Sequence, residues 1–124
     1  MRRDLHERLR KFAKRILNLA SYLRKIPEAR RLADQIARCG PSIGLNYAES
    51  QAASSQTHFI TLIETAEREA RETQAALEMI IDQEYVKPSL LKDLYQESCE
   101  IVAIFTTIAK NAKQNRAKGN PKKR

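Results

Sequence analysis

Tryptophan is missing from this sequence, and glycine, proline and aromatic residues are scarce. Its 124 residues include three glycines and four prolines, and aromatic side chains are 6% of the total. Hydrophobic residues are 42% and charged residues 31%. This balance favours helices over loops, and a chain of this length buries a core without disulfides or metals. The composition therefore predicts one helix-rich domain.

Cysteine is also rare. Cys39 and Cys99 lie sixty positions apart, with no CxxC motif and no histidine close to either in the sequence. Zinc sites and redox motifs need closer spacing of their ligands or thiols. We therefore expect two buried thiols in a reducing compartment.

Long apolar runs are absent too. No stretch approaches the roughly 20 apolar residues that cross a bilayer. A secretory signal would need an apolar core near the N-terminus, and charged residues interrupt it here. These features predict a cytoplasmic protein without a membrane partner. Binding of the first helix to an anionic membrane surface is a weaker alternative, because the bundle already needs its apolar side. The interrupting residues are Glu7, Arg8, Arg10, Lys11, Lys14 and Arg15.

The residue patterns of common catalytic sites are lacking as well. A diiron helical bundle needs ExxH pairs on two helices, and no ExxH occurs in the chain. His6 and His58 are isolated, and no nucleophile, base and orienting group occur together. Ser42 stands between glycines in GPSIG but lacks the strand-turn-helix context of a nucleophile elbow. We expect no catalytic residue, no metal and no cofactor.

Four apolar seams are present, which is the pattern of amphipathic helices in a bundle. Three of them alternate steps of three and four residues, and the second has steps of four, seven and four. Pro27 is placed to begin the second helix, and Ser89 is a suitable N-cap for the fourth. The pattern predicts an all-α, antiparallel up-down-up-down four-helix bundle over residues 1–112, followed by a flexible basic tail over 113–124. The seams are Leu5, Leu9, Phe12, Ile16, Leu19, Leu23 and Ile26; Leu32, Ile36, Ile43 and Tyr47; Phe59, Ile63, Ala66, Ala70, Thr73, Leu77 and Ile80; and Leu91, Leu94, Ser98, Ile101, Phe105, Ile108 and Ala112.

Two local features modify this pattern. Pro41 lies inside the second seam, where it removes a backbone donor and clashes with the carbonyl of Ala37, so we expect a kink or break near residues 38–42. The small polar residues at 50–57 compete with the backbone for hydrogen bonds. They predict a turn and the N-cap of the third helix.

The net charge of +8 is unevenly distributed along the chain. Residues 1–38 hold 12 basic and 4 acidic side chains, residues 39–100 hold 4 and 11, and residues 101–124 hold 7 and none. The three segments therefore carry +8, −7 and +7. Basic ends of this kind recruit a polyanion, or they dock on the acidic middle of a neighbouring subunit.

Arg8, Lys11 and Arg15 are spaced to share one face of the first helix, with Lys14 beside them. Phosphate contacts need only such positive charge, while the low aromatic content argues against base stacking. We predict that this face and the basic tail bind structured RNA or another polyanion. The alternative is a structural or protein-interaction module without nucleic-acid binding. The predicted binding residues are Arg8, Arg10, Lys11, Lys14, Arg15, Lys113, Arg116, Lys118, Lys122, Lys123 and Arg124.

The stretch from Arg38 to Thr73, RCGPSIGLNYAESQAASSQTHFITLIETAEREARET, resembles the signature of the 23S rRNA intervening-sequence protein family. The phrases LASYLRKIP and LADQIARCG extend the resemblance upstream, and Pro41 departs from the family pattern. The motif residues with an expected structural role are Arg38, Ser42, Gly44, Asn46, Glu49, Glu69 and Glu72. Their carboxylates are expected to contact Arg38, Asn46 or a neighbouring subunit.

The resemblance implies a bacterial four-helix bundle that assembles into a ring-like homopentamer. It also implies kinship with an accessory protein of diversity-generating retroelements, which acts with a reverse transcriptase and RNA. The expected partners are therefore further copies of the chain, structured RNA and a nucleic-acid enzyme. The resemblance implies no established biochemical activity.

Overall fold

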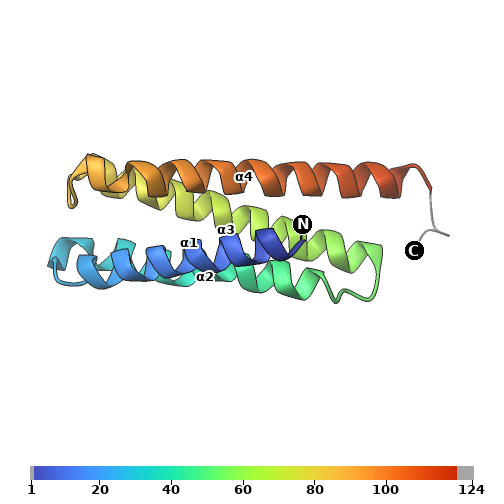
Figure 1. Cartoon of the computed structure of the whole chain (residues 1–124), viewed down its shortest axis with the longest axis horizontal. Helices are drawn as coiled ribbons and strands as arrows, with labels where there is room; N and C mark the ends of the chain where they lie inside the picture. Colours follow the sequence, from blue (N-terminus) through green and yellow to red (C-terminus); the bar gives the residue numbers. More distant parts are fainter. Residues whose placement is uncertain (1, 120–124) are drawn as a thin grey trace.

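The computed structural model describes residues 2–119, and within them the chain forms four long α-helices, one short 3₁₀ turn and no strand. Successive helices run antiparallel, so the start of the first and the end of the last point toward the same end of the molecule (Figure 1). The all-α four-helix prediction is confirmed. The elements are α1 (Arg2–Leu23), η1 (Pro27–Ala29), α2 (Arg30–Ser50), α3 (Gln56–Asp82) and α4 (Pro88–Ala117).

The apolar seams form one core. Phe12 and Ile16 of α1, Ile43 of α2 and Ile63 of α3 are at most 1% exposed. At the end of the core near the α2–α3 turn, the rings of Tyr47 and Phe105 meet edge to face, with centroids 5.9 Å apart. This geometry adds to the stabilisation from apolar burial. Some seam residues remain half-buried, namely Leu5, Leu19, Ile26, Leu32, Phe59 and Ile108.

Pro41 does not break α2, which is helical without interruption from Arg30 to Ser50. The expected break is therefore wrong. Proline in a helix interior costs about 3 kcal/mol. This helix packs along both α1 and α3, and that burial offsets the cost. Next to the proline, Gly40 allows close approach, because a Cβ added there would lie 2.8 Å from Cγ2 of Ile16.

The helix starts follow local chemistry. Pro27 begins η1, which leads into α2 at Arg30, as its position predicts. Ser55 caps α3 by accepting a hydrogen bond from the His58 backbone N–H at 3.0 Å, so the turn and cap predicted at 50–57 are confirmed. The prediction of Ser89 as the cap of α4 is wrong. Pro88 occupies the first turn after Lys87, where a missing N–H leaves no intrahelical bond unmade.

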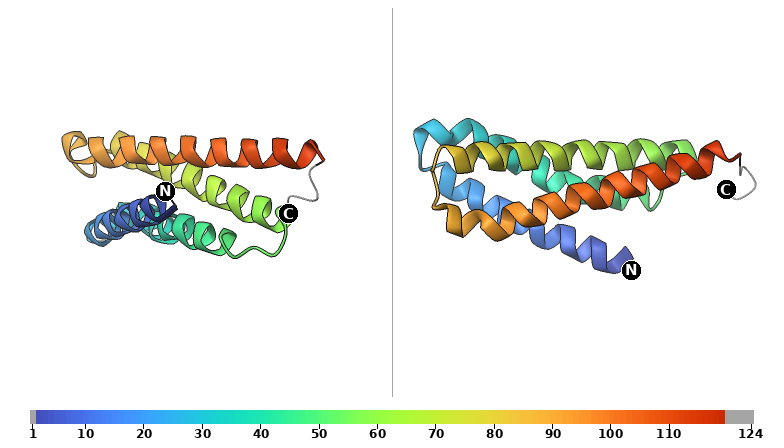
Figure 2. Two further views of the ribbon diagram at one scale, coloured as in Figure 1. Left: turned by 45° about the vertical axis from the view of Figure 1, so that its right-hand side comes forward. Right: turned by 90° about the horizontal axis from the view of Figure 1, so that it is seen from above.

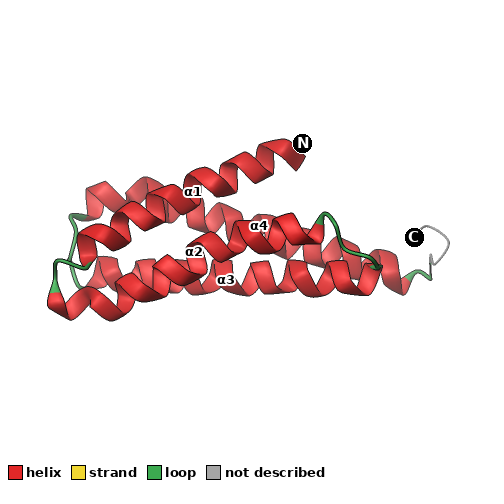
Figure 3. Ribbon diagram, turned by 90° about the horizontal axis from the view of Figure 1, so that it is seen from below, coloured by secondary structure: helices red, strands yellow, loops and turns green. Residues whose placement is uncertain are grey.

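The bundle is open between its first and last helices. Each helix packs extensively on its neighbour in the sequence, whereas α1 and α4 make few contacts with each other. The N-terminal half of α1 turns away from α4 (Figures 2 and 3). We call the open boundary between these two helices the α1–α4 seam, as distinct from the four apolar seams of the sequence. It leaves side chains of both helices accessible.

The last helix is longer than the apolar pattern indicates. It continues to Ala117, five residues past the boundary expected at residue 112. Most of the added residues, including Lys113 and Arg116, are good helix formers whose side chains face solvent, so they extend the helix without needing a core contact.

Candidate functional site

Arg8 is engaged in ion pairs at the α1–α4 seam. Its Nε donates to Glu97 Oε2 at 2.6 Å, and its Nη2 donates to Glu97 Oε1 at 2.8 Å and to Glu100 Oε1 at 2.6 Å. The hydrogen bonds to Glu97 and Glu100 raise the pKa of the guanidinium above its usual value. Gln96 also donates to Glu100, at 3.2 Å. Arg8, predicted to contact phosphate, thus joins α1 to α4 in this structure.

The other four predicted cations of α1 form an exposed cluster. Arg10, Lys11, Lys14 and Arg15 fall within two turns and face solvent. None of the ion pairs found among the described residues involves them. We call this cluster the α1 basic face. Its cations have no direct carboxylate partner among the described residues.

The predicted basic residues near the C-terminus differ in their surroundings. Lys113 forms an ion pair with Glu64 of α3. Arg116 and Lys118 are exposed, and no ion pair of the described residues includes them. The remaining predicted residues, Lys122, Lys123 and Arg124, lie outside the described part of the chain.

The motif residues Arg38, Glu69 and Glu72 come together between α2 and α3. Arg38 Nη2 lies 3.3 Å from Glu72 Oε1, and Arg38 Nη1 lies 3.8 Å from Glu69 Oε1. Gln35 also donates to Glu72, at 3.4 Å. The structure thus places two of the expected carboxylates against Arg38, within one chain.

Glu69 is the unusual member of this cluster. Its Oε1 is buried and accepts no hydrogen bond. Burial, and then the nearby charge of Glu72, raise the pKa of this carboxyl, while Arg38 opposes the shift. The folded environment therefore disfavours the charged form of this carboxyl.

Of the other motif residues, Ser42 and Asn46 form hydrogen bonds within α2, whereas Gly44 and Glu49 contribute no side-chain hydrogen bond among the described residues. Ser42 Oγ donates to the Arg38 carbonyl at 2.8 Å, and Asn46 Nδ2 donates to the Ser42 carbonyl at 3.0 Å. Gly44 lines a groove between α1 and α2. The Glu49 side chain is exposed and makes no hydrogen bond or ion pair with the described residues.

The two cysteines differ in burial. Cys39 is fully buried, and its Sγ lies 3.0 Å from Thr73 Oγ1. Burial raises the pKa of this thiol. Cys99 is only half-buried and accepts a hydrogen bond from Gln74 at 3.2 Å. The expectation of two buried thiols therefore holds for the first cysteine and is wrong for the second.

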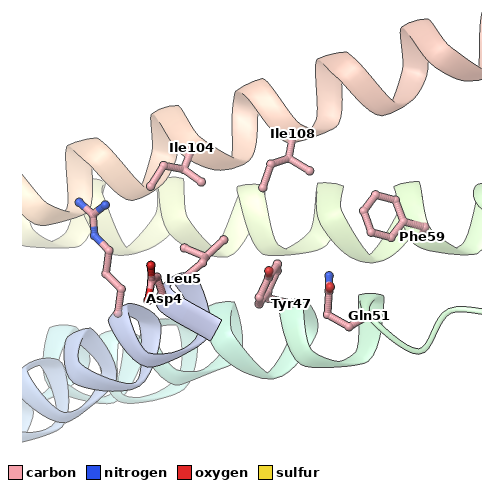
Figure 4. Close-up of a pocket in the computed structure, with 8 residues that line it drawn as sticks. Asp4, Leu5, Tyr47, Gln51, Phe59, Ile104 and Ile108 are labelled. Carbon is pink, nitrogen blue, oxygen red and sulfur yellow. The ribbon is translucent and has the colours of Figure 1, made fainter. Parts of the chain in front are cut away.

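Three hollows mark the surface of α1, and sequence reasoning missed all of them. One, of about 530 Å³, lies at the α1–α4 seam where Tyr47, Phe59 and Ile108 converge beyond the first turns of α1 (Figure 4). A second, of about 780 Å³, lies at the other end of the same seam, beside Tyr22 and Leu90. The third, of about 540 Å³, runs between α1 and α2. The sequence signal for the hollow between α1 and α2 is the presence of apolar residues outside the four apolar seams, such as Leu17 and Leu45.

Among the described residues, no three His, Cys, Asp or Glu side chains are grouped so as to hold a metal ion. No helix in that part of the chain is long and apolar enough to cross a membrane.

Comparison with known proteins gives the affiliation of the chain. The model of the family described as "23S rRNA-intervening sequence protein" matches residues 3–107. The chain is also similar to a solved structure from Bacteroides thetaiotaomicron, a protein of unknown function from the S23 ribosomal protein family. The identity is 33%, the TM-score is 0.79, and the match covers 85% of this chain and 97% of the other. No curated protein matches the chain. The chain therefore belongs to the 23S rRNA-intervening sequence protein family.

Proposed function

We propose that this chain is a non-enzymatic protein that binds the phosphate backbone of structured RNA through the α1 basic face. The observation that carries the proposal is the exposure of Arg10, Lys11, Lys14 and Arg15 without carboxylate partners in the described structure. An unneutralised row of cations attracts phosphate, and binding releases the counterions of the nucleic acid. The family description refers to an intervening sequence of 23S rRNA, and this association is the reason for proposing RNA as the polyanion.

The low aromatic content shapes this proposal. Aromatic residues are 6% of the chain and none lies on the α1 basic face, so few rings are present on which unpaired bases could stack. Recognition then depends on backbone charge and on the shape of the RNA. Arg116 and Lys118, in the last turn and at the C-cap of α4, are further exposed cations that can contact phosphate. The common direction of the start of α1 and the end of α4 is seen in Figure 1.

The test is the affinity for a structured RNA hairpin at rising salt. Changing Lys11 or Arg15 to Gln should weaken binding and flatten the plot of log affinity against log salt by about one unit for each phosphate that is no longer neutralised. Arg68→Gln is the matched control, because Arg68 is exposed on α3, which packs mainly on α2 and α4. Absence of binding at low salt, or an equal effect of the control substitution, contradicts the proposal.

A second candidate function is self-assembly into a ring, with the pentamer implied by the family resemblance. The supporting observation is that Tyr22 and Leu90, 50% and 70% exposed, lie together at the α1–α4 seam. Large apolar side chains grouped on a surface are typical of subunit contacts. Light scattering should give a mass of several chains, and Leu90→Glu should lower it. A monomer at micromolar concentration would rule this candidate out.

A further inference from the structure

The groove between α1 and α2 combines exposed apolar residues with cations. Leu17 of α1 is 43% exposed and Leu45 of α2 is 66% exposed, and both line it. Its lining spans His6 to Asn18 along α1, which is about 18 Å at 1.5 Å per residue. That length accommodates about three turns of another helix.

Small residues form part of the lining on the α2 side, and Gly44 is informative among them. A Cβ added to Gly44 would meet only Leu9 Cβ, at 3.5 Å, which is an ordinary contact. One helical turn earlier, a Cβ on Gly40 would clash with Ile16 at 2.8 Å. Packing of α1 on α2 therefore requires glycine at position 40 but not at position 44. The missing side chain of Gly44 instead leaves space in the groove for the backbone of an approaching helix.

The α1 wall of the groove is positively charged. Arg10 and Lys14 line it, and neither takes part in an ion pair of the described residues. Phosphate contacts do not explain the apolar lining, because phosphate gains nothing from Leu17 or Leu45. An acidic helix with an apolar stripe satisfies both the lining and the charge.

Among the described residues, no helix presents such a stripe with all of its anchors exposed. Helices that dock in grooves use large apolar anchors three, four or seven positions apart. The large exposed apolar side chains of the described residues outside this groove are Tyr22, Met79 and Leu90, on three different helices. No helix in that part of the chain offers two of them at the required spacing, which favours a partner protein over a second copy as the source of the complementary stripe.

We propose that the α1–α2 groove binds an acidic amphipathic helix of a partner protein. Apolar anchors of that helix pack on Leu17 and Leu45 above Gly44, and its carboxylates pair with Arg10 and Lys14. This surface goes beyond the RNA proposal. It shares Arg10 and Lys14 with the α1 basic face, but neither Lys11 nor Arg15 lines it.

The test uses a fluorescent synthetic helical peptide of about four turns, with leucines at i, i+4 and i+7 and glutamates beside them. Anisotropy should show binding to the full chain. Leu45→Glu, and separately the pair Arg10→Gln and Lys14→Gln, should each weaken it about tenfold or more. Met79→Glu is the matched control, since Met79 is 54% exposed on another face, and it should leave the affinity unchanged.

Four results would overturn the proposal. The first is no binding of the acidic peptide, and the second is equal binding of a peptide with lysines in place of the glutamates. The third is equal weakening by Met79→Glu. The fourth is a fall in the assembly's mass with Leu45→Glu, which would assign the groove to a second copy. Lys11→Gln with Arg15→Gln separates the two proposals. That pair should lower RNA affinity and leave peptide affinity within about twofold.

Discussion

Arg8 of α1 and Glu97 of α4, 89 positions apart in the sequence, form a two-pronged ion pair with N–O distances of 2.6 and 2.8 Å. It lies where α1 and α4 otherwise make few contacts, and Glu100 adds a third bond at 2.6 Å. Planar two-pronged pairing of this kind is more specific than a single lysine contact. The pair therefore bridges the α1–α4 seam.

Loss of this pair should destabilise the fold modestly. Arg8→Gln should lower the free energy of unfolding by about 1 kcal/mol at low salt, the upper end for a solvent-screened pair, because two carboxylates lose their partner. Urea denaturation measures this. A double-mutant cycle with Glu97→Gln should give a coupling energy that shrinks as salt rises. A coupling of zero would show that the pair contributes nothing to stability.

Acid should weaken the same contact. Hydrogen bonds from Gln96 and then Arg8 lower the pKa of Glu100 in the folded chain. The pKa of a glutamate in the unfolded chain is about 4.3, and a lower pKa in the folded chain means that the ionised carboxylate stabilises the fold above that pH. This stabilisation is lost as pH falls through the pKa of the folded chain. Urea denaturation of the wild type and Glu100→Gln should therefore differ most at pH 7 and converge below about pH 4. A difference that grows on acidification would contradict this assignment.

Glu69 should behave in the opposite way. Burial raises its pKa, so the charged form destabilises the folded chain above the folded pKa, and this effect disappears as pH falls below the unfolded value. Removing the charge with Glu69→Gln should raise the free energy of unfolding at pH 7 by about 1 kcal/mol. The gain should vanish near pH 4. Glu49→Gln is the matched control, since that carboxylate is exposed and does not belong to the Arg38 cluster.

The two glycines of α2 should respond with opposite signs to alanine. Gly40→Ala should destabilise the protein by about 1–3 kcal/mol, because its Cβ overlaps Ile16. Gly44→Ala should stabilise it by up to about 1 kcal/mol, since alanine is the better helix former and the space is open. Thermal unfolding of both variants provides the comparison. A large loss of stability at position 44 would contradict the idea that packing leaves that position open.

How far the sequence predicts this structure depends on the range of each interaction. The helices and most of the core follow from local periodicity, as Phe12, Ile63 and Leu77 illustrate. The exposure of Lys11 and Arg15 follows from the same pattern. The pairing of Arg8 with Glu97 does not, because it depends on how α4 is aligned against α1. Helical spacing places Arg8 beside Lys11 but does not show what lies across the seam.

The helix boundaries and the groove show the same limit. Pro41 is a local breaking signal that packing of α2 on two helices overrides. Leu17 and Leu45 are single apolar residues off the seams, and only the close pairing of α1 with α2 makes them two sides of one groove. The residues of such a surface are visible in the sequence, but their proximity is not.

The open seam also bears on how the chain folds. Because nearly all interhelical packing joins helices that follow one another in the sequence, each helix can dock on its predecessor without closing a long loop. Chains with such local contacts have low contact order and fold within microseconds to milliseconds. The Arg8 contact is among the few that join the ends of the chain, so its formation can follow docking of the other helices instead of limiting their rate.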